Sequence, residues 1–136
     1  MSLEENKVLS RQVIDTFNSG DIESLRNIFT NNFVWHFSST PAQNKEQFLE
    51  FTVNIKKSFP DFAFTIEDMI AENDQVFFRC IAMGTHTGPL QGIAPTNKRF
   101  RIIGFLQARI TDGKISEVWE NLDQLGQLQQ LGIVTP

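Results

Sequence analysis

The sequence predicts an α+β fold in which a bent, mostly antiparallel sheet wraps against N-terminal helices. Helical spacing of apolar residues dominates the first 60 residues, whereas alternating apolar runs dominate residues 62–122. Helices that cluster before the strands favour α+β over an alternating α/β arrangement. A strongly bent sheet that closes over helices leaves one open mouth, which is a preferred place for a pocket.

Capping residues and apolar spacing predict the helices. Ser2-Leu3-Glu4-Glu5 fits a capping box, and apolar residues follow it at helical spacing as far as Phe17. Asp21 and Asn44 are suited to cap two further helices, and Pro60 ends the second of these. The helices are therefore expected before Gly20, from Asp21 to Phe29 and from Asn44 to Phe59, with a short closing helix after Asp123.

Alternating side chains predict five strands. They are expected over residues 33–38, 62–66, 75–87, 99–111 and 114–122. The run from Gln75 to Thr87 has little polar alternation, which indicates a central strand covered on both sides.

The last two strands are joined by Asp112-Gly113, a strong hairpin turn. A two-residue turn pairs Ile110 with Ile115, and it then pairs Leu106 with Trp119 and Gly104 with Asn121. A bulge at Gly113 would shift the pairing by one residue and bring Arg109 inward. We prefer the unshifted register because it matches isoleucine with isoleucine beside the turn.

Composition limits the classes of function. The chain has 136 residues and a formal net charge of −4. It contains thirteen phenylalanines and no tyrosine, so we expect a strongly hydrophobic interior without phenolic hydrogen-bond donors. We interpret it as one domain over residues 1–136. The negative charge argues against nucleic acid or an anionic membrane as partner. The lone Cys80, in an apolar strand, reads as a buried inert thiol and favours a cytoplasmic location, and no apolar signal core is seen.

The last strand offers candidate site residues. Glu117, Trp119, Asn121 and Asp123 share one parity with Ile115, and such a mixture suits a pocket wall. The alternative is an outer or dimer-interface face with Trp119 as its anchor. An Asp123 carboxyl beside an apolar wall would be desolvated and able to carry a proton, although Asp is also a common helix N-cap.

Two histidines are further candidates. His36 and His86 lie on strands or strand ends, where a lone histidine is usually a satisfied hydrogen-bonding residue. On walls that converge with Asp123, they would form an acid–base group. Their spacing does not suit a metal, and no motif indicates a nucleophile or a phosphate-binding loop.

The C-terminal half resembles a known family. Gly84-Thr85-His86-Thr87-Gly88-Pro89-Leu90-Gln91-Gly92-Ile93, Asp112-Gly113-Lys114-Ile115, Glu117-Val118-Trp119, Asp123 and Gly126-Gln127-Leu128-Gln129-Gln130-Leu131-Gly132 together are similar to the SnoaL-like polyketide cyclase (ester cyclase) family of the nuclear-transport-factor-like superfamily. The resemblance is looser before Gly84. Asn97 stands where the family often has Gly, and Asn tolerates the same left-handed turn.

The resemblance implies a cone-shaped α+β barrel with a deep hydrophobic pocket, often dimeric through the sheet. It implies intramolecular aldol condensation without metal or cofactor, on a hydrophobic polyketide-like carbonyl compound, with Asp123 as general acid/base. By the resemblance, His36, His86, Trp119 and Asn121 would line the pocket or assist. Our own expectation for the substrate pocket is Phe17, Gly104, Leu106, Arg109, Trp119 and Asn121. The alternatives are a non-catalytic binding protein, an epoxide hydrolase using an inward Arg109, or a dimerisation module with a vestigial cavity.

Overall fold

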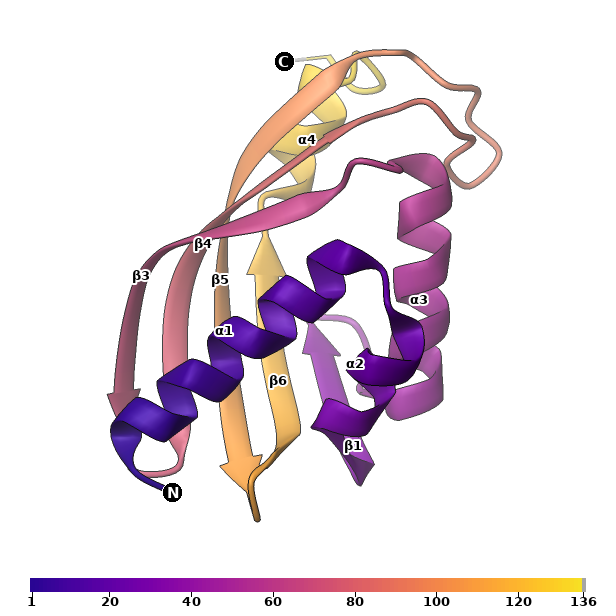
Figure 1. Ribbon diagram of the computed structural model, residues 1–136. Coiled ribbons are helices and arrows are strands. Elements are labelled where there is room, and N and C mark those ends of the chain that lie inside the picture. The colour runs from indigo at the N-terminus through magenta and orange to yellow at the C-terminus, as the bar shows by residue number, and fades with distance from the viewer. Residues whose placement is uncertain (136) are drawn as a thin grey trace.

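The computed structural model describes residues 1–135 and places its first three helices against one face of a strongly bent sheet (Figure 1). The helices are α1 (Leu3–Ser19), α2 (Ile22–Ile28), α3 (Lys45–Ser58) and α4 (Gln124–Gln130). The strands are β1 (Phe29–Phe37), β2 (Gln43–Asn44), β3 (Ala63–Glu72), β4 (Gln75–Thr85), β5 (Arg99–Thr111) and β6 (Lys114–Leu122).

The described residues form one six-stranded sheet with the order β2-β1-β6-β5-β4-β3. The pair β1 and β6 is parallel, and every other neighbouring pair is antiparallel. The strands from β3 to β6 follow one another as a meander, so the predicted α+β class with a mostly antiparallel sheet is confirmed. No helix within residues 1–135 has the length and apolar character needed to span a membrane.

The predicted caps are present. Ser2 begins α1 through a complete capping box, and Asn44 begins α3 in the same way with Gln47. Gly20 ends α1 in the left-handed region at φ 78°, where glycine carries no steric penalty. Asp21 caps α2 by accepting the Ser24 backbone N–H.

Three boundaries differ from expectation because tertiary pairing extends the strands. Phe29 belongs to β1 and not to α2, so β1 begins four residues before residue 33, where the strand was expected to start. The strand β3 continues to Glu72, because its residues pair with β4 as far as Gln75. The short β2, which pairs with β1, was not predicted.

The register of β5 and β6 was also predicted wrongly. Ile110 pairs with Ile115 as expected, but Arg109 pairs with Glu117, so one extra residue of β6 stands between the two pairs. Beyond this bulge, Leu106 pairs with Glu120, and Gln107 pairs with Trp119. The shift reverses the inside and the outside of β6 from Glu117 onward.

The connection between β4 and β5 packs onto the C-terminal end of α3 (Figure 1). The backbone N–H of Gly88 donates to the Ser58 carbonyl at 3.0 Å, and the Ser58 hydroxyl donates to the Pro89 carbonyl at 2.7 Å. A Cβ at Gly88 would lie 1.9 Å from the Lys57 carbonyl oxygen. Only glycine therefore allows the two backbones to approach this closely.

We expect Gly88→Ala to lower the free energy of unfolding by roughly 2–3 kcal/mol, because the new methyl group would force the connection away from α3. The matched control is Thr87→Ala, which changes the neighbouring exposed side chain. Urea unfolding of both variants checks the prediction. Equal stability of Gly88→Ala and wild type would contradict the close approach.

Candidate functional site

An apolar cavity lies between the inner face of the sheet and the helices. Eight of the twenty residues that line it are phenylalanines, from α1 (Phe17), α3 (Phe48 and Phe51) and β3 (Phe64) among others. Its volume of about 80 Å³ is several times the roughly 10–15 Å³ that one water molecule requires, so it is a cavity and not a packing gap. Phe51 and Gln124 are exposed members of the wall, so the cavity reaches the surface beside them.

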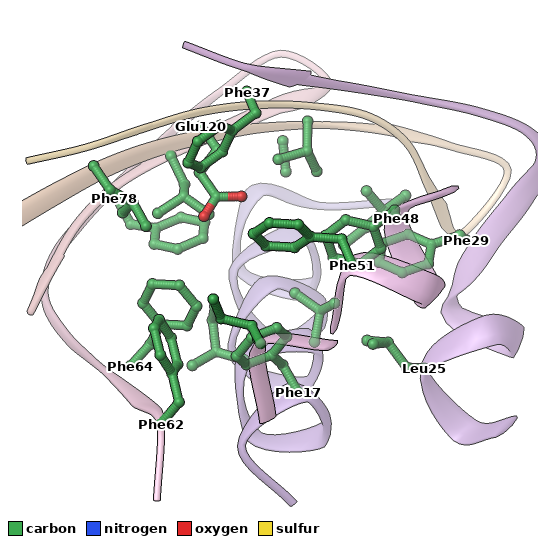
Figure 2. A pocket seen from close by; sticks show the side chains of 18 of the residues that line it. Phe17, Leu25, Phe29, Phe37, Phe48, Phe51, Phe62, Phe64, Phe78 and Glu120 are labelled. Atoms are coloured by element: carbon green, nitrogen blue, oxygen red, sulfur yellow. The ribbon is translucent and has the colours of Figure 1, made fainter. Parts of the chain in front are cut away.

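Glu120 is the one ionisable side chain among the residues described as lining this cavity. It lies on β6, and Figure 2 shows its carboxyl directed inward on the side of Phe37 and Phe78. Only 8% of the residue is exposed. The indole N–H of Trp35 donates a hydrogen bond to Glu120 Oε1 at 3.0 Å. The site is thus one carboxyl group in a mainly apolar, phenylalanine-rich space, with Gln124 and Gln127 as the other polar residues of the wall.

Burial raises the pKa of Glu120 from its ordinary value of 4.5 to about 7, because the ionised form loses hydration, and the Trp35 hydrogen bond opposes this effect. Cys80, on β4, is also buried, and burial together with the nearby Glu120 charge raises the pKa of its thiol to about 12. The predicted burial of Cys80 is therefore confirmed. Near neutral pH the thiol stays neutral, whereas Glu120 is poised to accept or release a proton.

The predicted pocket residues divide between the two faces of the sheet. Phe17 and Leu106 line the cavity. Gly104 lies opposite Leu122 and not Asn121, and a Cβ built on it would lie 2.3 Å from Leu122 Cδ2, so Leu122 fills the space expected for a ligand. The bulge in β6 turns Trp119 and Asn121 outward, and both lie outside the cavity wall.

Arg109 and His36 belong to a charged cluster on the outer face. Arg109 contacts Glu117 at 3.2 Å and Asp74 at 3.7 Å, and its guanidinium carbon lies 5.4 Å from the centre of the Trp119 ring. His36 Nε2 lies 2.6 Å from Glu117 Oε2, and its ring stacks on Trp119. The alternative bulge at Gly113 would have brought Arg109 inward, but the bulge lies in β6 at Ser116 and leaves Arg109 on the outer face.

His86 is buried at the start of the connection between β4 and β5. The Thr96 backbone N–H donates to its Nδ1 at 3.2 Å, and the Thr96 hydroxyl lies 3.0 Å from the same atom. The His86 backbone also bonds Asn97 and Lys98. His86 is therefore well placed to hold the connection in shape, and it is not part of the cavity wall.

Asp123 is exposed and acts as the N-cap of α4, with Oδ1 accepting the Gly126 N–H at 2.9 Å. A helix N-cap was the alternative to a pocket acid that the sequence left open for this residue. The structure does not bring Asp123, His36 and His86 together: they lie at a helix start, on the outer face and in a loop anchor, respectively. Their catalytic roles remain predictions.

Glu120 was missed because the expected register assigned it to the face away from the pocket. The signal that could have found it is the spacing of apolar residues in β6: Ile115, then Val118 and Leu122, can share one face only if an extra residue intervenes. Glu120 then falls between Val118 and Leu122 on the inner face. Within residues 1–135, no group of three or more His, Cys, Asp or Glu side chains is arranged to hold a metal ion.

The raised pKa of Glu120 predicts a specific pH dependence of stability. Its contribution is fully present below the unfolded pKa near 4.5 and is lost as pH rises through about 7, because the folded protein then resists ionisation. Relative to Glu120→Gln, we expect the wild type to lose about 2.5 kcal/mol of unfolding free energy between pH 5 and pH 8.

Urea unfolding of both proteins at the two pH values measures this difference. The neutral glutamine is the matched control, since the other titrating groups contribute equally to both proteins. If the difference in unfolding free energy between wild type and Glu120→Gln did not change with pH, the Glu120 carboxyl would not have a raised pKa.

Solved structures with similar folds come from several bacteria. A proposed hydroxylase from Streptomyces galilaeus, AclR, aligns over 99% of this chain and 85% of its own, with a TM-score of 0.90 and 24% identity. A proposed SnoaL-like polyketide cyclase from Jannaschia sp. CCS1 aligns over 98% of this chain and 94% of its own, with a TM-score of 0.88 and 20% identity. At these identities the likeness establishes the fold.

Another solved structure is more similar in sequence. IdmH from Streptomyces antibioticus, a proposed polyketide cyclase, is 30% identical over 93% of this chain and 98% of its own, with a TM-score of 0.84. No curated protein matches the chain. The model of one family, described as SnoaL-like polyketide cyclase, matches residues 7–131. The chain therefore belongs to the SnoaL-like polyketide cyclase family.

Proposed function

We propose that this protein is a cofactor-independent acid–base catalyst that acts on a hydrophobic, polyketide-like carbonyl compound, with Glu120 as the group that moves the proton. The observation that carries the proposal is the position of one carboxyl, with a pKa of about 7, in an aromatic cavity. A general acid/base is most effective when its pKa lies near the working pH. Membership of a polyketide cyclase family and the similarity to IdmH support the substrate class.

The proposed chemistry is an intramolecular aldol reaction. Ionised Glu120 takes a proton from the carbon next to a carbonyl, and the C–H electron pair becomes that of the enolate. The enolate carbon attacks a second carbonyl of the same molecule, which closes a ring and leaves an alkoxide. Glu120 then returns its proton to the alkoxide oxygen. The apolar wall removes water, so the carboxylate is a stronger base than it would be in solution.

The polar end of the substrate has candidate partners at the surface side of the cavity. Gln124 and Gln127 lie three residues apart on α4, on one face of the helix, and both line the cavity. Their amide N–H groups can donate to a carbonyl or enolate oxygen. This arrangement would orient a molecule with its apolar body among the phenylalanines and its oxygen toward α4.

Glu120→Gln tests the acid–base role. In D₂O, the wild type is expected to exchange the protons next to the carbonyl of bound apolar ketones and β-keto esters for deuterium, which ¹H NMR measures. The variant keeps the shape of the side chain but cannot take a proton, so the exchange rate should fall about 10²–10⁴-fold.

Asp123→Asn is the matched control, because Asn can still cap α4. We expect its exchange rate to stay within a few-fold of wild type. Loss of exchange in Asp123→Asn with retention in Glu120→Gln would return the role to Asp123, as the family resemblance implied. Saturable ligand binding without exchange in the wild type would favour the non-catalytic binding protein.

We also propose that the protein is a homodimer that pairs through the outer face of the sheet. Ile70, Phe77, Met83, Ile103 and Phe105 alternate outward from β3, β4 and β5, and each is between 42% and 63% exposed. The rings of Phe77 and Phe105 stack at 5.9 Å. These exposed apolar side chains share one face with the exposed Arg79 and Arg101, which pair with Phe105 and Met83, and the group favours a protein partner. A second copy can cover it by two-fold pairing.

Phe105→Glu tests the dimer, because it would place a charge in the centre of the buried patch. We expect a wild-type dimer at micromolar concentration and a monomeric variant, as measured by sedimentation velocity. The control is Val8→Glu on α1, a residue that is 63% exposed and lies away from this face. A monomeric wild type, or a Phe105→Glu variant that dimerises as tightly, would contradict the interface.

A further inference from the structure

We infer that Trp35 is a positioning residue: its indole N–H occupies Oε1 of Glu120, so that the exchangeable proton of this carboxyl is carried on Oε2, the oxygen open to the cavity. The inference rests on the proposed acid–base role of Glu120 for its functional meaning. The hydrogen bond between Trp35 and Glu120 can itself be measured without any enzymatic turnover.

The pairing of β1 with β6 brings the two side chains together. These strands are parallel, with Trp35 opposite Val118 and Phe37 opposite Glu120. Trp35 is 1% exposed, and the centre of its ring lies 5.0 Å from the ring centres of both Phe48 and Phe51. A side chain packed this closely has little freedom to turn its N–H away from the carboxyl.

The chemistry of the indole decides which oxygen can hold a proton. An indole N–H only donates, so it can bond Oε1 only while that oxygen offers a lone pair. A proton on Oε1 facing the indole would set two donors against each other. Glu120 Oε2 has no hydrogen-bond partner within the described residues, and Figure 2 shows the carboxyl directed into the cavity. The proton is therefore held on the side where a substrate would bind.

The groups that could otherwise control this carboxyl are few. Cys80 approaches from β4, and burial raises the pKa of its thiol to about 12, so it stays neutral. His36, Glu117 and Arg109 lie on the outer side of β1, β6 and β5, where they contact one another. No cation is described among the residues that line the cavity. The Trp35 dipole is thus the specific polar contact that favours the ionised form of Glu120.

Indole NMR tests the contact directly, because the chain contains two tryptophans. We would record ¹H–¹⁵N correlation spectra of the ¹⁵N-labelled protein from pH 5 to pH 9, assigning the two indole signals with Trp35→Phe and Trp119→Phe. The Trp35 signal should move with a midpoint near 7, and this movement should vanish in Glu120→Gln. The Trp119 ring stacks on His36 at the outer face of the sheet, so its indole signal is the internal control and should behave alike in wild type and Glu120→Gln.

Trp35→Phe tests the consequence. It keeps an aromatic ring but removes the donor, so the titration midpoint of Glu120, followed by ¹³C NMR of the labelled carboxyl, should move to higher pH by about one pH unit. The pH profile of deuterium exchange should move in the same direction, with a larger change in kcat than in KM. Trp119→Phe should leave the Glu120 midpoint unchanged.

The outcomes separate this inference from the proposed function. A Trp35 signal that is independent of pH, or that titrates unchanged in Glu120→Gln, overturns the positioning role even if Glu120 proves essential. Full exchange activity in Glu120→Gln overturns the proposed function, while the coupled titration of Trp35 and Glu120 would still stand. If Trp35→Phe does not fold, the indole titration of the wild type decides the question alone.

Discussion

The extra residue in β6 determines which side chains reach the interior of this protein. Ile115 packs inward before the bulge, and Val118, Glu120 and Leu122 point inward after it. The Ser116 hydroxyl supports the bulge, since it lies 2.8 Å from the Thr111 hydroxyl and 3.3 Å from the Arg109 carbonyl. Because side chains alternate along a strand, a β6 without the extra residue would turn Glu120 to the outer face. The apolar cavity and its acid thus depend on this local irregularity.

Burying Glu120 weakens the fold and prepares the chemistry by the same physical effect. Removal from water disfavours the carboxylate, which raises its pKa to about 7 and lowers stability where the group must ionise. The cost is limited because the protonated form is neutral and because Trp35 supplies one hydrogen bond. A structural core would gain stability from an apolar residue at this position. Retaining an acid there is the kind of compromise that proteins make at functional sites.

The elements could be predicted from the sequence because their signals are local. The capping boxes at Ser2 and Asn44 and the turn at Asp112-Gly113 each depend on neighbouring residues, and each is present. The register of β6 against β5 depends on a bulge at Ser116, just past the turn, which the turn sequence does not signal. The pairing predicted from the turn is therefore wrong by one residue from Glu117 onward. That error moved the predicted site from Glu120 to Trp119 and Asn121. Trp119 beside carboxylates was read as a pocket wall, whereas it belongs to an outer face with its own aromatic and charged contacts.

The two glutamates of β6 occupy contrasting surroundings, and this contrast favours one of them for proton transfer. Both meet β1, the strand that runs parallel to β6, but on opposite faces of the sheet. Glu117 is held by His36 and Arg109 in a partly exposed cluster, where fixed partners compete with any substrate for its oxygens. Glu120 meets a single indole donor, and its second oxygen has no hydrogen-bond partner among residues 1–135. A group that must both take and return a proton needs such a free oxygen more than it needs a strong ion pair, which would hold it ionised.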